Sequence, residues 1–135
     1  MKKRLVNPPT LPPPRGFTHG IVTTGGSLLF LAGQAGTDAT GRIADPDDFV
    51  KQCARALQNL EAVVVAAGGG MQDIVKLDMF VRSREQYQSH LKPLGRVFRS
   101  FFHGYWPTMA LFEVAGFAEP DALVELEGLA VLPTE

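Results

Sequence analysis

The chain has 135 residues, of which 45% are hydrophobic and 20% charged, which is enough for one domain with its own hydrophobic core. Its formal net charge of -1 is unlike the strongly positive charge of proteins that bind nucleic acid or an anionic membrane, so we expect neither as a partner. Cys53 is the only cysteine, which excludes an intrachain disulfide and a CxxC metal site.

The N-terminal segment combines positive charge with proline. Lys2, Lys3 and Arg4 are not followed by the apolar segment of a signal peptide, and no run in the chain is apolar enough to span a bilayer. We therefore expect a cytoplasmic protein. Residues 1–15 hold five of the ten prolines and predict an extended, polyproline-like arm, with 16–135 as a single domain. The arm could bind a proline-recognising module, or lie along its own or a neighbouring subunit.

Two strands and a helix are predicted next along the chain. Residues 17–24 predict a strand ending at Gly25 and Gly26, a pair typical of a hairpin, and the apolar run 27–33 predicts a strand buried on both faces. Asp47 or Asp48 can cap the following helix, whose apolar residues recur at helical spacing up to the glycines at 68–70.

The second half of the chain repeats this alternation. Residues 74–82 predict a strand, and apolar positions from 87 to 101 predict a helix that starts or kinks at Pro93. Residues 108–115 and 122–132 predict two strands joined by a turn. The order predicts an α+β fold with two helices on one face of a mixed sheet. Because several strands are apolar on both faces, we expect copies of the same chain to cover the other face.

Few residues suggest chemistry by themselves. Glu125 and Glu127 point to the same side of their predicted strand, and at least one of them could line a ligand cleft. The alternative is one glutamate held by backbone N–H groups and one at an exposed edge. His19, His90 and His103 show no metal-ligand spacing, so we expect no metal. Trp106 anchors a loop or forms a pocket wall.

Several motifs together resemble the RidA (YjgF/YER057c/UK114) family over nearly the whole chain. The residues that carry the resemblance are Phe17-Thr18-His19 behind Gly16, the FLAGQ motif at 30–34, DIVKLDMFVR at 73–82, Pro107 followed by Glu113-Val114-Ala115, and VELEGLA at 124–130. The resemblance implies a chorismate-mutase-like fold assembled as a homotrimer with three inter-subunit clefts. It also implies hydrolysis of reactive imines and enamines to ketoacids and ammonia, without a metal or an organic cofactor.

The resemblance also identifies candidate site residues. In the family, an arginine two places after the proline grips the substrate carboxylate, helped by a backbone N–H near Gly33 and by a glutamate, here Glu127, that acts through water. In this chain the arginine position is Met109, and the cleft positions of a serine and a tyrosine are Ala32 and Phe17. Losing the anchor removes a bond worth about 1.5–3 kcal/mol, so the fold carries over and the standard deaminase mechanism does not.

Three functions remain open from the sequence. In the first, a homotrimer binds a small, relatively apolar molecule in a cleft lined by Phe17, Ala32, Gly33, Trp106, Met109, Leu111 and Glu127. In the second, the chain is an imine or enamine deaminase in which Glu127 positions water and another cation, from Arg15, Arg96 or Arg99, replaces the arginine. In the third, it is an endoribonuclease, a description that some members of the family carry, although the charge balance argues against it.

Overall fold

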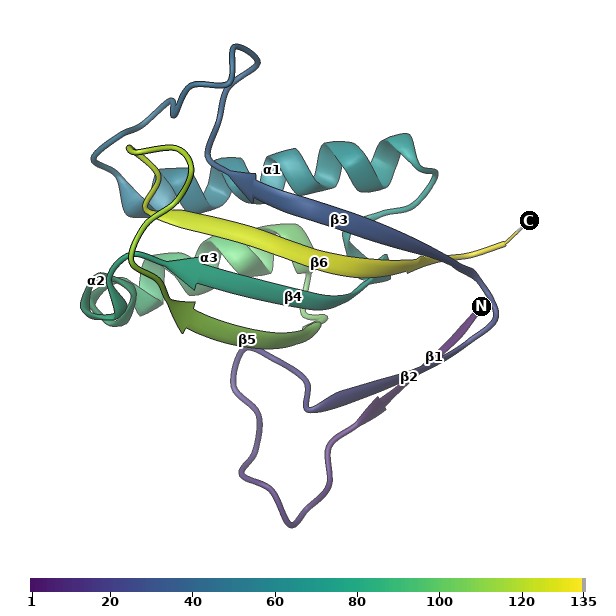
Figure 1. Ribbon diagram of the computed structural model, residues 1–135. Coiled ribbons are helices and arrows are strands. Elements are labelled where there is room, and N and C mark those ends of the chain that lie inside the picture. Colours follow the sequence, from purple (N-terminus) through teal and green to yellow (C-terminus); the bar gives the residue numbers. More distant parts are fainter. Residues whose placement is uncertain (135) are drawn as a thin grey trace.

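A four-stranded mixed sheet forms the centre of the fold in the computed structural model, which describes residues 1–134. In spatial order its strands are β3 (Ser27–Ala35), β6 (Val124–Leu132), β4 (Ile74–Val81) and β5 (Thr108–Glu113). β4 and β5 are parallel, whereas β6 runs antiparallel to both β3 and β4. β3 and β5 are therefore the two edges of this sheet (Figure 1). β5 and β6, although joined by a turn in the chain, do not pair, because β4 lies between them.

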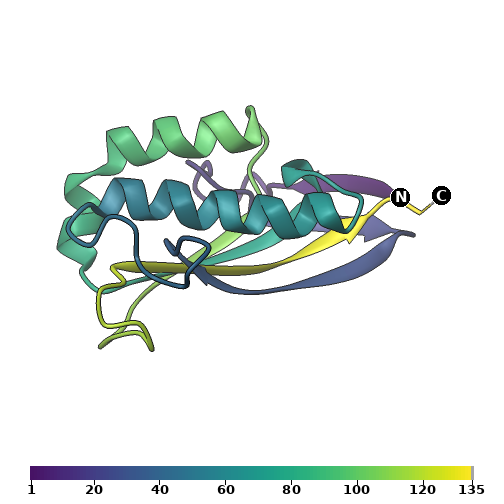
Figure 2. The same ribbon diagram turned by 90° about the horizontal axis from the view of Figure 1, so that it is seen from above.

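The helices lie on one face of the sheet, as Figure 2 shows. They are α1 (Phe49–Ala66), the short α2 (Arg84–Ser89) and α3 (Leu91–Phe102). Asp48 caps α1, since its carboxylate accepts from the Lys51 backbone N–H at 3.0 Å. Pro93 is the third residue of α3, in the first turn, where its missing N–H leaves no helical bond unmade. The predicted α+β class is confirmed, and the helix predicted over residues 87–101 is divided at His90, three residues before Pro93, into α2 and α3.

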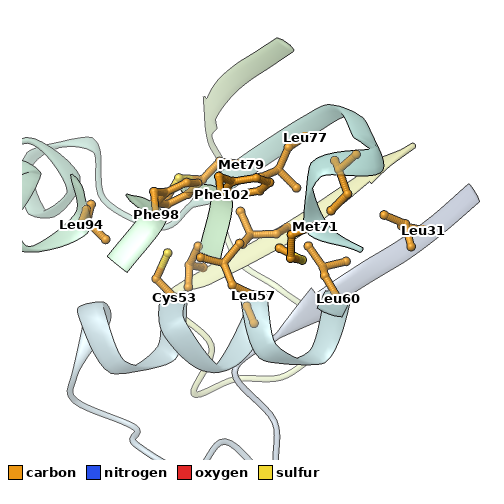
Figure 3. Close-up of a cluster of buried hydrophobic side chains, with 14 of the residues drawn as sticks. Leu31, Cys53, Leu57, Leu60, Met71, Leu77, Met79, Leu94, Phe98 and Phe102 are labelled. Carbon is orange, nitrogen blue, oxygen red and sulfur yellow. The ribbon is translucent and has the colours of Figure 1, made fainter. Parts of the chain in front are cut away.

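The hydrophobic core fills the space between the helices and the sheet. Figure 3 shows side chains from α1, α3 and the strands gathered in one cluster, including Leu57, Leu60, Met79 and Phe102. Cys53 belongs to this cluster and is fully buried. Burial raises the pKa of its thiol to about 12, so Cys53 is a small apolar packing residue and not a nucleophile.

Gln52 is a buried polar residue that ties two loops to α1. Its side-chain NH₂ donates to the backbone carbonyls of Asp45, Pro46 and Asp121 at 2.9, 3.2 and 3.1 Å. Its side-chain carbonyl accepts from the Leu123 backbone N–H at 2.8 Å. All of its polar atoms thus have partners, which removes the cost of burying an amide.

The N-terminal segment differs from the expectation for residues 1–15. Its first residues form the strand β1 (Lys2–Val6), which pairs antiparallel with β2 (Gly20–Thr24), and the prolines lie in the connection between them. The predicted hairpin of β2 with β3 is absent from the sheets of residues 1–134. Gly25 and Gly26 have φ of 75° and 84°, a backbone that favours glycine, and lead the chain from this ribbon into the central sheet.

The face of the sheet opposite the helices carries exposed apolar side chains. Leu28 and Phe30 of β3 are 62% and 75% exposed, while Leu29 and Leu31 of the same strand pack towards the core. Phe112 of β5 is 48% exposed and stacks on Phe80, with ring centroids 5.4 Å apart. No helix within residues 1–134 is long and apolar enough to cross a membrane.

Candidate functional site

A cavity of about 240 Å³ lies where α2 and α3 meet β4 and β5. Its apolar lining includes Met79, Leu94, Phe98, Trp106 and Met109. The rings of Phe98 and Trp106 are stacked, with centroids 6.5 Å apart and planes 24° apart, and form a flat aromatic wall. This wall suits a flat or branched apolar group of modest size.

Polar groups stand beside this apolar lining. Arg15 and Arg99 line the cavity, and both residues are exposed. Tyr87 lines it as well, and burial, with a smaller contribution from Cys53, raises the pKa of the Tyr87 hydroxyl. The hydroxyl therefore stays protonated at neutral pH and can donate a hydrogen bond.

The segment that carries Arg15 is fastened to the beginning of β5. Thr18 is buried, its backbone N–H donates to the Pro107 carbonyl at 3.0 Å, and its hydroxyl donates to the Trp106 carbonyl at 2.6 Å. These two bonds hold the N-terminal loop beside the residues that lead into β5. Phe17 next to this anchor packs edge-on against His19, with centroids 5.1 Å apart.

A second cavity, also of about 240 Å³, adjoins the first along β5. The two share Arg15, Gly16, Met79, Tyr87 and Met109, and the second adds Phe17, Ala110 and Leu111. Met109 pairs with Leu77 and Leu111 with Met79 across the parallel β4–β5 ladder, so both point to the helix side of the sheet. The structure thus brings together four of the predicted lining residues: Phe17, Trp106, Met109 and Leu111.

The other three predicted residues form a separate group on β3 and β6. The pairing steps from Leu31–Gly128 to Gln34–Leu126, so Ala32 and Gly33 form a bulge opposite Glu127. Glu127 is exposed and pairs in register with Asp78, on the face of the sheet opposite the helices. It lines a shallow hollow of about 280 Å³ there with Phe30, Lys76 and Asp78. Lys76 and Asp78 make a salt bridge of 2.8 Å.

Within one chain, therefore, Glu127 and Met109 lie on opposite faces of the sheet and do not share a cavity. Of the three candidate arginines, Arg15 and Arg99 line the cavity that contains Met109, and Arg96 does not. Tyr87 and Gly95 also line it, and sequence reasoning did not identify either as a site residue. Tyr87 fits the apolar spacing of a core position, so its hydroxyl gave no separate signal. Residues 1–134 contain no cluster of three or more potential metal ligands.

Comparison with known proteins gives consistent matches over most of the chain. A family model described as endoribonuclease L-PSP matches residues 10–132. A 2-iminobutanoate/2-iminopropanoate deaminase of Dermatophagoides farinae is 29% identical over 136 aligned positions, covering 96% of this chain and 97% of the relative. TdcF of Escherichia coli strain K12, named as a reactive intermediate deaminase, is 32% identical over 110 positions, covering 78% and 80%.

Solved structures agree with these matches. The structure of YyfB from Yersinia pestis, a Rid-family protein of unknown function, superposes with a TM-score of 0.88 at 30% identity and covers 98% of this chain and 100% of its own. RidA from the Antarctic bacterium Psychrobacter sp. superposes with a TM-score of 0.68 at 24% identity, covering 96% and 99%. The second likeness concerns the fold alone.

Proposed function

The chain belongs to the endoribonuclease L-PSP family, which includes the Rid proteins, and we propose that it acts as a homotrimer whose inter-subunit clefts bind a small, relatively apolar molecule. The observation that supports this proposal most directly is the separation of the candidate site into two groups. Met109 and Leu111 lie on β5, at one edge of the sheet, and Ala32 and Gly33 lie on β3, at the other. A second copy that places its β5 beside the first copy's β3 would complete one cleft from both groups.

The outward face of the sheet gives the reason for association. Leu28, Phe30 and Phe112 are large apolar side chains with about half or more of their surface exposed. Burying apolar surface releases about 25 cal/mol per Å², so covering this face with another copy is favourable. The same contact would bring Glu127, which lies on that face, out of bulk water and towards the neighbouring copy.

The apolar lining favours binding over the chemistry of the named relatives. A thioether at Met109 cannot make the two parallel hydrogen bonds that a guanidinium makes with a carboxylate. Phe17, Leu111 and Trp106 around it are apolar or aromatic as well. We therefore expect a ligand that gains most of its affinity from apolar contact.

Deamination of an imine or enamine is the second candidate, and the two arginines at the Met109 cavity favour it. In this reaction water adds to the imine carbon and ammonia leaves, so that a ketone remains. Glu127 from a neighbouring copy would position the water. Endoribonuclease activity has less support, because both imidazoles are engaged within the fold. His19 donates from Nε2 to the Pro12 backbone carbonyl in the N-terminal loop, while His90 donates from Nδ1 to the Gln86 backbone carbonyl in α2.

Two measurements test the proposal. Light scattering coupled to gel filtration should give three times the chain mass of 14.6 kDa, and a clean monomer would remove the inter-subunit cleft. In a competition assay against spontaneous hydrolysis, 2-aminoacrylate-type imines should disappear at nearly the same rate with and without the protein. A strong acceleration at catalytic amounts would establish the deaminase instead.

A further inference from the structure

Two arginines line the cavity that Met109 also lines, and we infer that Arg15 and Arg99 form an anion-binding pair there, so that the ligand of the cleft is a small organic carboxylate with an apolar body. This inference rests on the proposed binding function and specifies the chemical class of the ligand. It also selects Arg15 and Arg99, and not Arg96, as the cations of the site.

The two arginines reach the cavity from different parts of the fold. Arg99 comes from α3, and Arg15 from the N-terminal loop that Thr18 fastens to the Trp106 and Pro107 carbonyls. Because separate elements hold them, two guanidinium groups can approach one ligand from two sides. Planar guanidinium groups match the two oxygens of a carboxylate.

Neither positive charge is neutralised by a salt bridge within residues 1–134. The one salt bridge of this part of the chain joins Lys76 and Asp78 on the other side of the sheet. Two like charges that line one cavity repel each other, and a bound anion relieves that repulsion. The charge pattern is therefore complementary to a monoanion or dianion.

Gly95 makes room for one of these guanidinium groups. It lies in the interior of α3, where glycine is disfavoured relative to alanine, and it lines the same cavity. A Cβ atom built on Gly95 would lie 3.1 Å from Nη1 of Arg99 and 3.8 Å from its Cζ. The guanidinium thus lies back over the bare backbone of the preceding turn, beside the cavity, and an alanine there would push it away by a few tenths of an ångström.

The remaining lining defines the other end of the ligand. The stacked rings of Phe98 and Trp106, with Met79 and Met109, provide apolar contact and no further charge. A cavity of about 240 Å³ is below the usual size of drug-binding pockets and suits a metabolite with one ring or one branched chain. An aryl- or alkyl-substituted carboxylate satisfies both ends.

Phenylacetate and its neutral counterpart phenylacetamide test this inference, because they differ little in shape and carry or lack the charge. We expect isothermal titration calorimetry of the full chain to show phenylacetate binding about tenfold more tightly than phenylacetamide. Arg15→Gln and Arg99→Gln should each weaken phenylacetate binding about fivefold and leave phenylacetamide unchanged. Arg96→Gln is the matched control, since Arg96 is an exposed arginine of the same helix outside the cavity, and it should change neither affinity.

Gly95→Ala gives a second, independent variant. It should weaken phenylacetate binding by displacing the Arg99 guanidinium, without lowering thermal stability. Equal binding of phenylacetate and phenylacetamide would overturn the anion pair and leave the apolar cleft intact. Absence of binding of both to a trimeric sample, or an equal loss in Arg96→Gln, would also overturn it. Arginine-dependent binding by a monomeric protein would support the arginine pair and contradict the proposed inter-subunit cleft.

Discussion

Met109→Arg places a third positive charge in the cavity that Arg15 and Arg99 already line. Met109 is half-buried on the helix side of β5, so the new guanidinium must either stay in the cavity or extend towards its mouth. Glu127 of the same chain lies on the opposite face of the sheet and cannot pair with it. The free variant should therefore be less stable than the natural chain.

The size of this effect follows from how open the site is. An uncompensated buried charge costs about 3–5 kcal/mol, but a cavity open to water lets the long arginine side chain keep part of its hydration, so we expect a loss of about 1–2 kcal/mol. For a chain of this length, that loss lowers Tm by about 3–8 °C. Phenylacetate at about 100 times the Kd of the variant should restore about 2.7 kcal/mol by mass action on the folded state, which exceeds the loss. At the same ligand concentration the natural chain, which has one cation fewer and a higher Kd, should gain less.

Thermal unfolding followed by circular dichroism, with and without phenylacetate, measures both quantities. Met109→Gln is the neutral control and should show a smaller loss and no added response to phenylacetate. The double variant Met109→Arg/Arg99→Gln returns the number of cations to two and should recover most of the stability of the free protein. If Met109→Arg melts like the natural chain and responds to phenylacetate no more strongly, Met109 does not share a cavity with the two arginines, and the reasoning is refuted.

Three further perturbations test the interface, the sheet and the core. Phe30→Asp puts a charge on a side chain that is 75% exposed on the outward face, and light scattering should show the proposed trimer dissociating; an unchanged mass would place the interface elsewhere. Gly128→Ala builds a Cβ into the Lys76 carbonyl oxygen, which forces β6 away from β4, and urea unfolding should show a loss of about 2–4 kcal/mol, whereas Gly70→Ala, with open space around it, should be nearly neutral. Burial raises the pKa of the Cys53 thiol from 9.0 to about 12, so its contribution to stability is complete below pH 9.0 and is lost as the pH rises towards 12, by about 1.4 kcal/mol per pH unit. Unfolding across this window should be steeper in pH for the natural chain than for Cys53→Ala, and parallel curves would contradict the burial argument.

The helices could be predicted from the sequence because their signals are local. The Asp48 cap and the apolar spacing of α1 lie within one short stretch, and the structure confirms both. Strand pairing depends on residues far apart in the chain. The turn between β5 and β6 therefore does not indicate that β4 lies between these two strands in the sheet. The short, mostly charged β1 lacks the apolar alternation that predicts a strand.

The candidate site shows the same division between local and distant information. The motif containing Met109 and Leu111 could be located along the chain, but the sequence does not say that Glu127 faces the other side of the sheet. The sequence alone does not tell which of the candidate arginines reach the Met109 cavity, because this depends on where α3 and the loop held by Thr18 lie in the fold. Gln52 was missed for a related reason, since its partners are carbonyls of two separate loops.

The positions of the two arginines also determine which way a carboxylate ligand would lie. If Arg15 and Arg99 hold the carboxylate, the apolar body points towards Met109 and the Phe98–Trp106 wall, and the carbon next to the carboxylate stays near the arginines. Hydrolysis of an imine at that carbon needs a base within hydrogen-bond reach, directly or through one water. Glu127 meets this requirement only if a neighbouring copy brings it to the arginines, because in its own chain the sheet lies between them. A ligand held by the two arginines in this orientation can therefore bind in any assembly. Catalysis, in contrast, requires an assembly in which the β3–β6 group of one copy lies beside the β5 group of the next.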